Sequence, residues 1–179
     1  GPEAVHQGLL LEASPLPEPD LQTILERPGT IVVLDQITDP HNVGAVLRSC
    51  AAFAVAGLVM TARHSPSASA VLAKSASGGL EHVPIAKVTN LSKAIEAISS
   101  NNVTCIGLDS EAEDDLQACA SDARRMALVL GAEGKGLRHK TRETCDRLAT
   151  IPMPGAIQSL NVSNAAALAL YIADRQQPA

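Results

Sequence analysis

The 179-residue chain is long enough to form one domain with a sizeable core. Its composition, 46% hydrophobic and 18% charged residues, excludes a largely disordered polypeptide. The net charge of −5 argues against holding nucleic acid by overall charge, and with only one Phe and one Tyr an aromatic platform for stacking bases is not expected.

The first 30 residues are expected to be irregular. Prolines at positions 15, 17, 19 and 28 disfavour regular structure, and the segment ASPLPEPD at 13–20 is typical of a linker. A linker at this position predicts that residues 1–30 are the remnant that follows a missing upstream domain.

From residue 31 onward the pattern alternates between strands and helices. Apolar runs predict strands at 31–35, 57–60, 82–88, 103–109, 126–131 and 148–153. Helical spacing of apolar residues predicts helices from Pro40 to near Gly57 and over 67–76, 91–99, 137–146 and 162–175. This alternation predicts an α/β fold with a mostly parallel sheet and helices on both faces.

The last predicted helix is apolar almost all round, in the run NAAALALYIA. Such a helix should be buried on more than one side. In a domain of this size, packing against a second copy of the chain would achieve that burial. We therefore expect a homodimer formed through the C-terminal helix.

The cysteines show no pattern of metal ligands or disulfides. No pair among Cys50, Cys105, Cys119 and Cys145 has C-x-x-C spacing, and no histidine lies at a ligand spacing from them. We expect reduced thiols, no bound metal and a cytoplasmic protein. Without a signal peptide or an unbroken apolar run of about 18 residues, neither export nor membrane insertion is expected.

Three polar segments follow predicted strands, where open α/β sheets bind their ligands. They are DPHNVGAVLRSC at 39–50, LGAEGKGL at 130–137 and IPMPG…SLNVSNAAALAL at 151–170. The middle segment is a glycine loop, but its glycine spacing is neither the dinucleotide fingerprint nor a phosphate-binding P-loop. Its late position and the missing ribose-binding acid disfavour a dehydrogenase.

Two segments of the chain are rich in charged residues of one sign. Acidic residues cluster at 109–115, and basic residues cluster at 135–142, directly beside the glycine loop. A solvated helix face would explain the basic cluster, but its position favours local contact with phosphate groups.

The three segments, in this order, resemble the motifs of the SpoU/TrmH branch of the SPOUT RNA methyltransferases. The similarity runs from about residue 31 to 175 and is greatest to the bacterial 23S rRNA guanosine 2′-O-methyltransferases. It implies a methyltransferase domain at 31–179 with a deep C-terminal trefoil knot, bound S-adenosylmethionine (SAM), a homodimer, and an RNA-binding domain upstream. Asn164 departs from the family, which usually has a small apolar residue there.

The resemblance also implies roles for single residues. Glu133 would orient Asn42 or Arg48, and Arg48 would hold phosphate and ribose and stabilise developing negative charge on the 2′-hydroxyl. The implied catalytic set is Asn42, Arg48, Glu133, Ser159 and Asn161. The implied SAM-binding set is Leu108, Gly131, Glu133, Gly134, Ile151, Met153, Leu160, Asn161 and Ser163, and RNA backbone contacts are expected at Arg138, Lys140 and Arg142.

Two alternatives to an rRNA-modifying enzyme stay open. One is a tRNA 2′-O-methyltransferase of the same family, because the subgroup motifs are shared. The other is a non-catalytic RNA-binding or assembly module that keeps the fold. A module without catalysis has no need of all five implied catalytic residues together, which favours the enzyme.

Overall fold

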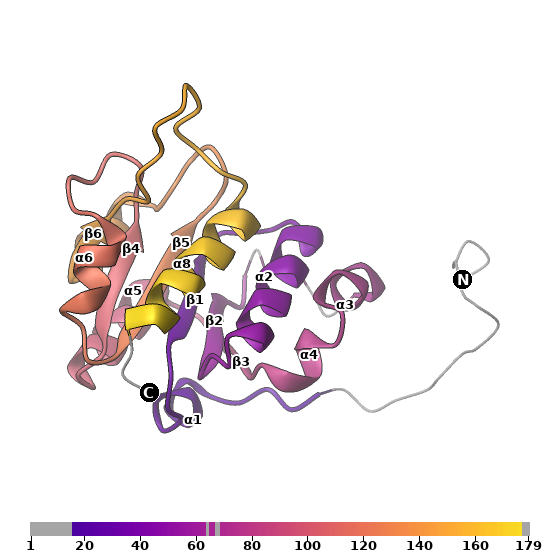
Figure 1. The fold of residues 1–179 in the computed structure, drawn as a ribbon. Helices are drawn as coiled ribbons and strands as arrows, with labels where there is room; N and C mark the ends of the chain where they lie inside the picture. Colours follow the sequence, from indigo (N-terminus) through magenta and orange to yellow (C-terminus); the bar gives the residue numbers. More distant parts are fainter. Residues whose placement is uncertain (1–15, 64, 67–68, 177–179) are drawn as a thin grey trace.

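A computed structural model describes residues 16–63, 65–66 and 69–176 of the chain. They form a six-stranded parallel sheet covered by helices on both faces (Figure 1). The strands are β1 (Ile31–Asp35), β2 (Gly57–Thr61), β3 (Ile85–Val88), β4 (Thr104–Leu108), β5 (Met126–Gly131) and β6 (Arg147–Ala149). The helices are α1 (Leu21–Leu25), α2 (Pro40–Ala52), α3 (Ala70–Ala76), α4 (Gly79–His82), α5 (Leu91–Ser100), α6 (Leu116–Ser121), α7 (His139–Thr144) and α8 (Val162–Gln176).

The strand order, β3-β2-β1-β5-β4-β6, confirms the predicted α/β class. From β1 the chain builds outward through β2 to β3, then crosses over and builds the other half of the sheet. The order in which strands are added to the sheet reverses between β1 and β5, where Asp35 pairs with Gly131. In open α/β sheets, ligands bind outside the carboxyl ends of the strands at such a reversal.

Alternate residues of the central strands enter two separate cores. Val32 and Leu34 of β1 face the core under α2, α6 and α8, whereas Ile31 and Val33 face the core under α1 and α5. All four side chains are buried. A strand with both faces covered must be apolar throughout, which is why IVVL reads as one continuous apolar run.

Two short helices were not predicted from the sequence, and the first lies in a segment that was expected to be irregular. Helix α1 lies within residues 1–30, where Asp20 caps it by accepting a hydrogen bond from the backbone N–H of Thr23 at 2.8 Å, and Ile24 is fully buried. Helix α6 follows directly on the acidic run, because Asp115 accepts from the backbone N–H of Gln117 at 2.7 Å. In both segments the acidic residue is a helix cap, which overrides the polar or proline-rich composition around it.

Element boundaries also differ from the prediction at four other places. The predicted strand 148–153 is shorter, because β6 ends at Ala149 and Pro152 cannot donate to a sheet. The predicted stop at Gly78–Gly79 instead begins the one-turn helix α4, and α7 is shorter at both ends than the predicted 137–146. The helix expected over 67–76 begins at Ala70, and residues 67–68 lie outside the described residues.

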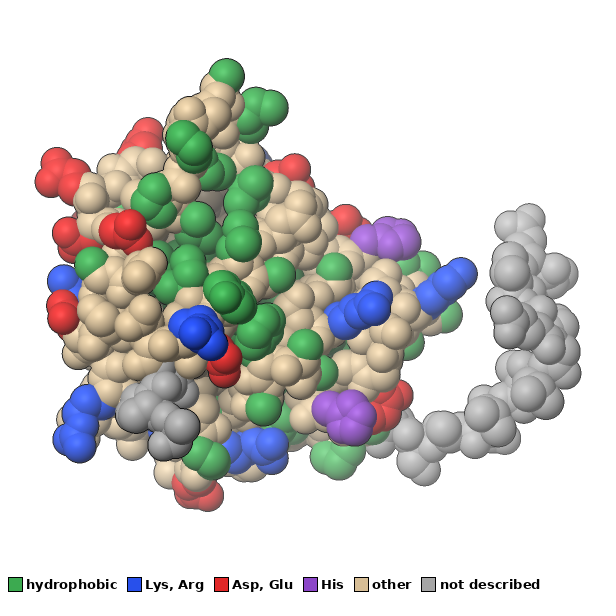
Figure 2. Space-filling model, in the orientation of Figure 1, with side chains coloured by type: hydrophobic (Ala, Val, Ile, Leu, Met, Phe, Trp, Pro, Cys, Tyr) green, Lys and Arg blue, Asp and Glu red, His purple; other side chains and the backbone are tan. Residues whose placement is uncertain are grey.

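Helix α8 crosses the front of the sheet beside α2 and α6 (Figure 1). Ala166, Ala169 and Leu170 of its inner face are buried, whereas Leu168 is 44% and Tyr171 55% exposed. Hydrophobic side chains gather along this helix and over the loop that projects above it (Figure 2). One apolar stripe of the helix is therefore uncovered in a single chain, and the predicted homodimer stays a prediction, as does the knot.

No helix in the described part of the chain is long and apolar enough to cross a membrane.

Candidate active site

A cavity opens at the carboxyl edge of the sheet, where β4, β5 and β6 end. The glycine loop forms one wall, and the segment between β6 and α8 forms another. Of the residues expected at a SAM site, those that line the cavity are Leu108, Gly131, Glu133, Gly134, Ile151, Met153 and Leu160, together with Ser159 of the catalytic set.

Several lining residues were not predicted from the sequence. Asp109 and Ser110 follow β4, Thr150 follows β6, and Gln158 and Ala165 flank the Ser159 segment. The rule that ligands bind after strand ends would have found Asp109 and Thr150, since both directly follow strands.

A polar cluster forms beside this cavity, with Asn161 at its centre. The Asn161 side-chain amide donates to Oδ1 of Asn42 at 3.0 Å and to Oε2 of Glu133 at 3.3 Å. Its Oδ1 accepts from the backbone N–H of Ser163 at 2.9 Å and from the Ser163 hydroxyl at 2.6 Å. The Asn161 amide nitrogen thus faces two acceptors, and its oxygen faces two donors. Only one orientation of this amide satisfies all four contacts.

The cluster joins three segments that are far apart in the sequence. Asn42 lies in the first turn of α2, which begins with the cap Asp39 and with Pro40 at its first position. Asn161 caps α8, because its carbonyl accepts from Ala165 and its side chain accepts from Ser163. Asn161 is therefore a structural cap as well as the centre of the cluster, and Glu133 contacts it directly.

Arg48 lies outside this cluster in a single chain. It follows Asn42 by six residues on α2, so the two side chains project about 120° apart around the helix and about 9 Å apart along it. The Arg48 side chain is exposed and forms no hydrogen bond or ion pair with another described residue. Its own chain therefore does not bring it to Asn161.

Two glycines of the loop have backbone conformations that other residues adopt only with strain. Gly134 has φ +76° and Gly136 has φ +63°, and the loop closes where the N–H of Gly136 donates to the carbonyl of Ala132 at 2.8 Å. Gly131 is required for a different reason, because a Cβ there would lie 2.1 Å from the carbonyl carbon of Gly136. The loop therefore folds back against the end of β5 with no room for a side chain.

We expect Gly131→Ala to damage both the fold and the cavity, because the added methyl group meets backbone that cannot move aside. The expected loss is about 1–3 kcal/mol of unfolding free energy, together with loss of cofactor binding. Gly155→Ala is the matched control, since a Cβ there meets nothing within 4 Å. Thermal unfolding and ligand titration of both variants check this; parental behaviour of Gly131→Ala would contradict the described loop.

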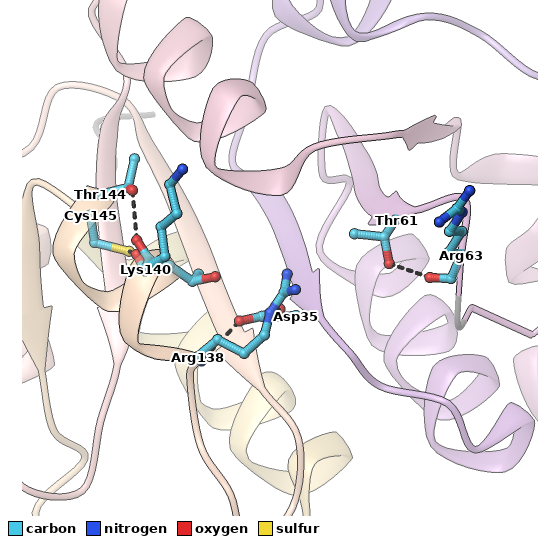
Figure 3. A network of polar contacts seen from close by, with 8 residues as sticks. Asp35, Thr61, Arg63, Arg138, Lys140, Thr144 and Cys145 are labelled. Atoms are coloured by element: carbon cyan, nitrogen blue, oxygen red, sulfur yellow. Dashed lines mark hydrogen bonds and ion pairs between the residues drawn. The ribbon is translucent and has the colours of Figure 1, made fainter.

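Of the three basic residues beside the glycine loop that were expected to contact RNA, two form ion pairs with carboxylates in the described part of the chain and one does not. Nε of Arg142 lies 3.1 Å from the carboxylate of Asp109, and Nε of Arg138 lies 2.7 Å from that of Asp35. The Lys140 ammonium has no partner among the described residues, and its carbonyl accepts from the Thr144 hydroxyl (Figure 3). The expected RNA contacts at these positions stay predictions.

The thiols do not provide a nucleophile. Burial raises the pKa of Cys50 and of Cys145 to about 12, so both are protonated at neutral pH. Burial also raises the pKa of Cys105 and of Cys119. No group of three or more metal-ligating side chains is found in the part of the chain that the structure describes.

Comparison with known families identifies the chain. The model of the SpoU rRNA methylase family matches residues 29–171, which contain all three motifs and the whole sheet. The chain belongs to the SpoU rRNA methylase family.

Relatives in this family have stated activities. The chain is 41% identical, over 97% of its length and 73% of the relative's, to the 23S rRNA (guanosine-2′-O-)-methyltransferase RlmB of Salmonella typhi. The SpoU methyltransferase AviRb from Streptomyces viridochromogenes, solved in complex with AdoMet, which is SAM, is 28% identical with a TM-score of 0.79. That match covers 90% of this chain and 63% of AviRb, so the chain spans less than two thirds of that SpoU protein.

A tRNA-modifying member of the family has the same architecture. The TrmH/SpoU tRNA modifying enzyme of A. aeolicus is 27% identical with a TM-score of 0.72, and the match covers 87% of this chain and 80% of that enzyme. SpoU proteins that modify different RNAs thus share this fold, so the fold by itself does not identify the RNA.

Proposed function

We propose that the chain is a SAM-dependent RNA methyltransferase that transfers a methyl group to a ribose 2′-hydroxyl, in 23S rRNA and on a guanosine. The observation that carries the proposal is the Asn42–Asn161–Glu133 cluster beside the cavity, in a chain 41% identical to an RlmB enzyme. The distant tRNA-modifying relative, at 27% identity, makes tRNA the weaker alternative.

The cavity suits a nucleoside ligand, because it combines apolar walls with exposed backbone and polar groups. Leu108, Ile151, Met153 and Leu160 supply apolar walls, and the glycine loop offers backbone groups without side chains in the way. Bound SAM would supply an activated methyl group on a sulfonium. We therefore assign these residues, with Gly131, Glu133, Gly134 and the neighbouring Asn161 and Ser163, to holding it.

The polar cluster would prepare the acceptor hydroxyl. A ribose hydroxyl is a weak nucleophile, so the site must align it with the methyl carbon and help remove its proton as the carbon–oxygen bond forms. The half-buried Asn161 amide orients Asn42, whose own side-chain nitrogen has no partner among the described residues and can donate to a ribose hydroxyl. Glu133 orients Asn161, and Ser159, exposed at the cavity, is assigned to contact the acceptor.

Arg48 needs a second copy of the chain to act in this chemistry. It projects away from its own Asn161, and the exposed stripe of Leu168 and Tyr171 on α8 offers a face for a partner. A homodimer through α8 would bring Arg48 of one chain to the cluster of the other. There its guanidinium would hold a phosphate and stabilise charge on the 2′-oxygen, a role that does not require it to lose a proton. Exposed Asn164 lies one turn before Leu168 on the same stripe and would need a partner in that contact.

Residues 31–179 would form the methyltransferase domain and residues 1–30 the segment that leads into it from an upstream RNA-binding domain, with α1 of that segment packed into the core of the domain. The RlmB relative is longer than the matched region, which leaves room for a further domain. Arg138, Lys140 and Arg142 would contact the RNA backbone. A non-catalytic module is disfavoured, because it would have no need of the contacts that join Asn42, Asn161 and Glu133 beside the cavity.

Calorimetric titration with S-adenosylhomocysteine, the product of SAM, tests the proposal. We expect saturable binding of about one molecule per chain, because each chain carries a complete cavity. Absence of binding at high ligand concentration would contradict the enzyme and favour the non-catalytic module.

A further inference from the structure

A buried carboxylate at the carboxyl end of β1 has no role in the chemistry assigned above. The side chain of Asp35 is fully buried. The residue lies between β1 and β5, where the order of strand addition reverses, and its backbone is paired with Gly131 of the glycine loop. Burying a carboxylate costs several kcal/mol unless it is well paired. Arg138 supplies the pairing through its backbone N–H at 3.0 Å from Oδ2 and its Nε at 2.7 Å from Oδ1 (Figure 3).

This pairing occupies only part of the Arg138 guanidinium. The side chain is 46% exposed, and its two terminal Nη groups have no partner among the described residues. Arginine that serves only to neutralise a carboxylate commonly uses both nitrogens of one side of its fork. Here the buried acid fixes the stem of the side chain and leaves the terminal nitrogens at the surface.

A second arginine follows the neighbouring strand at the same edge. The register that pairs Leu34 with Met60 places Thr61 beside Asp35. The Thr61 hydroxyl donates to the carbonyl of Arg63 at 2.6 Å and ties the start of the next loop to the sheet (Figure 3). The Arg63 side chain is exposed, with no hydrogen bond or ion pair to another residue that the structure describes.

The Arg138 guanidinium, fixed in this way, is suited to bind phosphate. The planar fork matches phosphate oxygens, and a fixed side chain loses less entropy on binding than a free one. A chain with a net charge of −5 must obtain RNA affinity from such local sites. Asp35 lies on the face of the sheet opposite α2, so a phosphate here would sit across the central strands from Asn42.

We propose that Asp35 is a positioning residue that presents Arg138 to a backbone phosphate of the RNA substrate, and that the exposed Arg63, which follows the neighbouring strand, contacts the RNA backbone at the same edge of the sheet. The inference rests on the proposed function and adds two residues, Asp35 and Arg63, that no sequence motif indicated. Its alternative is that the Asp35–Arg138 pair merely pins the glycine loop to the sheet.

The test is the salt dependence of binding to bacterial 23S rRNA, measured alongside titration with S-adenosylhomocysteine. Arg138→Gln should weaken RNA binding about tenfold to a hundredfold and reduce the slope of log affinity against log salt by about one. Arg63→Gln should reduce the slope in the same way. Asp35→Asn should weaken RNA binding without reducing the slope, because the Arg138 charge remains but is no longer held in place.

Arg27→Gln is the matched control, since it removes an equal charge from an exposed position before β1, at the other end of the strand. It should leave the slope unchanged. All four variants should bind S-adenosylhomocysteine as the parent does.

The inference is overturned if Arg138→Gln keeps the parental slope. It is also overturned if Asp35→Asn and Arg138→Gln lose S-adenosylhomocysteine binding and thermal stability in step with RNA binding, because that is the signature of a pinned loop. A parent that binds no S-adenosylhomocysteine would instead contradict the proposed function, so the two failures are distinguishable.

Discussion

Replacing Asn161 by Asp should abolish methyl transfer while leaving the fold intact. The Asn161 Nδ2 group donates to Asn42 and Glu133. An Asp oxygen in its place would face the Glu133 carboxylate, and the Asn42 amide would have to turn its NH2 group inward to pair with it. Without these contacts Asn42 and Glu133 are no longer held in place, and misplacement of the groups that align the reactants lowers kcat by about a hundredfold. The other side-chain oxygen still accepts from Ser163 and caps α8, so the unfolding free energy should stay within about 1 kcal/mol of the parent.

The comparison of Asn161→Asp with Asn161→Ala separates catalysis from capping. The Ala variant should lose both activity and about 1 kcal/mol of stability, because no side chain caps the helix. Methyl transfer from labelled SAM and urea unfolding supply the two readouts. If Asn161→Asp turned over RNA at near-parental rates, the cluster would be a structural cap and the proposed catalytic role of Asn161 would be wrong.

The second large effect concerns Arg48. Arg48→Ala should lose most methyl transfer as a homodimer while still binding S-adenosylhomocysteine, because Arg48 does not line the cavity. Co-expression with the inactive Asn161→Asp chain should restore activity to about a quarter of the parental level. Half of randomly assorted dimers are mixed, and each has one site with both Arg48 and Asn161 intact.

Lys74→Ala is the control for this experiment, because Lys74 is another exposed cation on this side of the sheet, in α3. It should be active alone and need no complementation. Failure of the mixed dimers to exceed the activity of either inactive parent would contradict the shared site. A chain that stayed monomeric in ultracentrifugation while fully active would contradict it as well.

The alternating pattern of the chain was sufficient to predict the fold class. Central strands such as IVVL are buried on both faces, so their apolar runs were unambiguous, and the amphipathic helix after Pro40 carried its own start signal. The short helices α1 and α6 were missed because each has only five or six residues. Periodicity needs a longer window than that, so the caps Asp20 and Asp115 were their only signals.

The sequence predicted some residues of the candidate site but not the long-range contacts between them. Residues directly after strands, such as Gly131 and Ile151, could be placed at one edge of the sheet, because parallel strands all end there. The buried pairing of Asp35 with Arg138 could not be predicted from the sequence, since it joins residues 103 positions apart. The separation of Arg48 from Asn161 depends on how α2 packs, which sequence spacing leaves open.

The most direct measurement is transfer of the labelled methyl group of SAM by the unsubstituted chain to 23S rRNA from a bacterium that lacks the RlmB enzyme, followed by alkaline hydrolysis. A 2′-O-methyl group blocks the 2′-oxygen that attacks the neighbouring phosphate, so label should remain in alkali-resistant dinucleotides that contain guanosine. Label recovered on a base, or label absent from dinucleotides that contain guanosine although methyl groups are transferred, would contradict the assignment of guanosine ribose methylation to this chain.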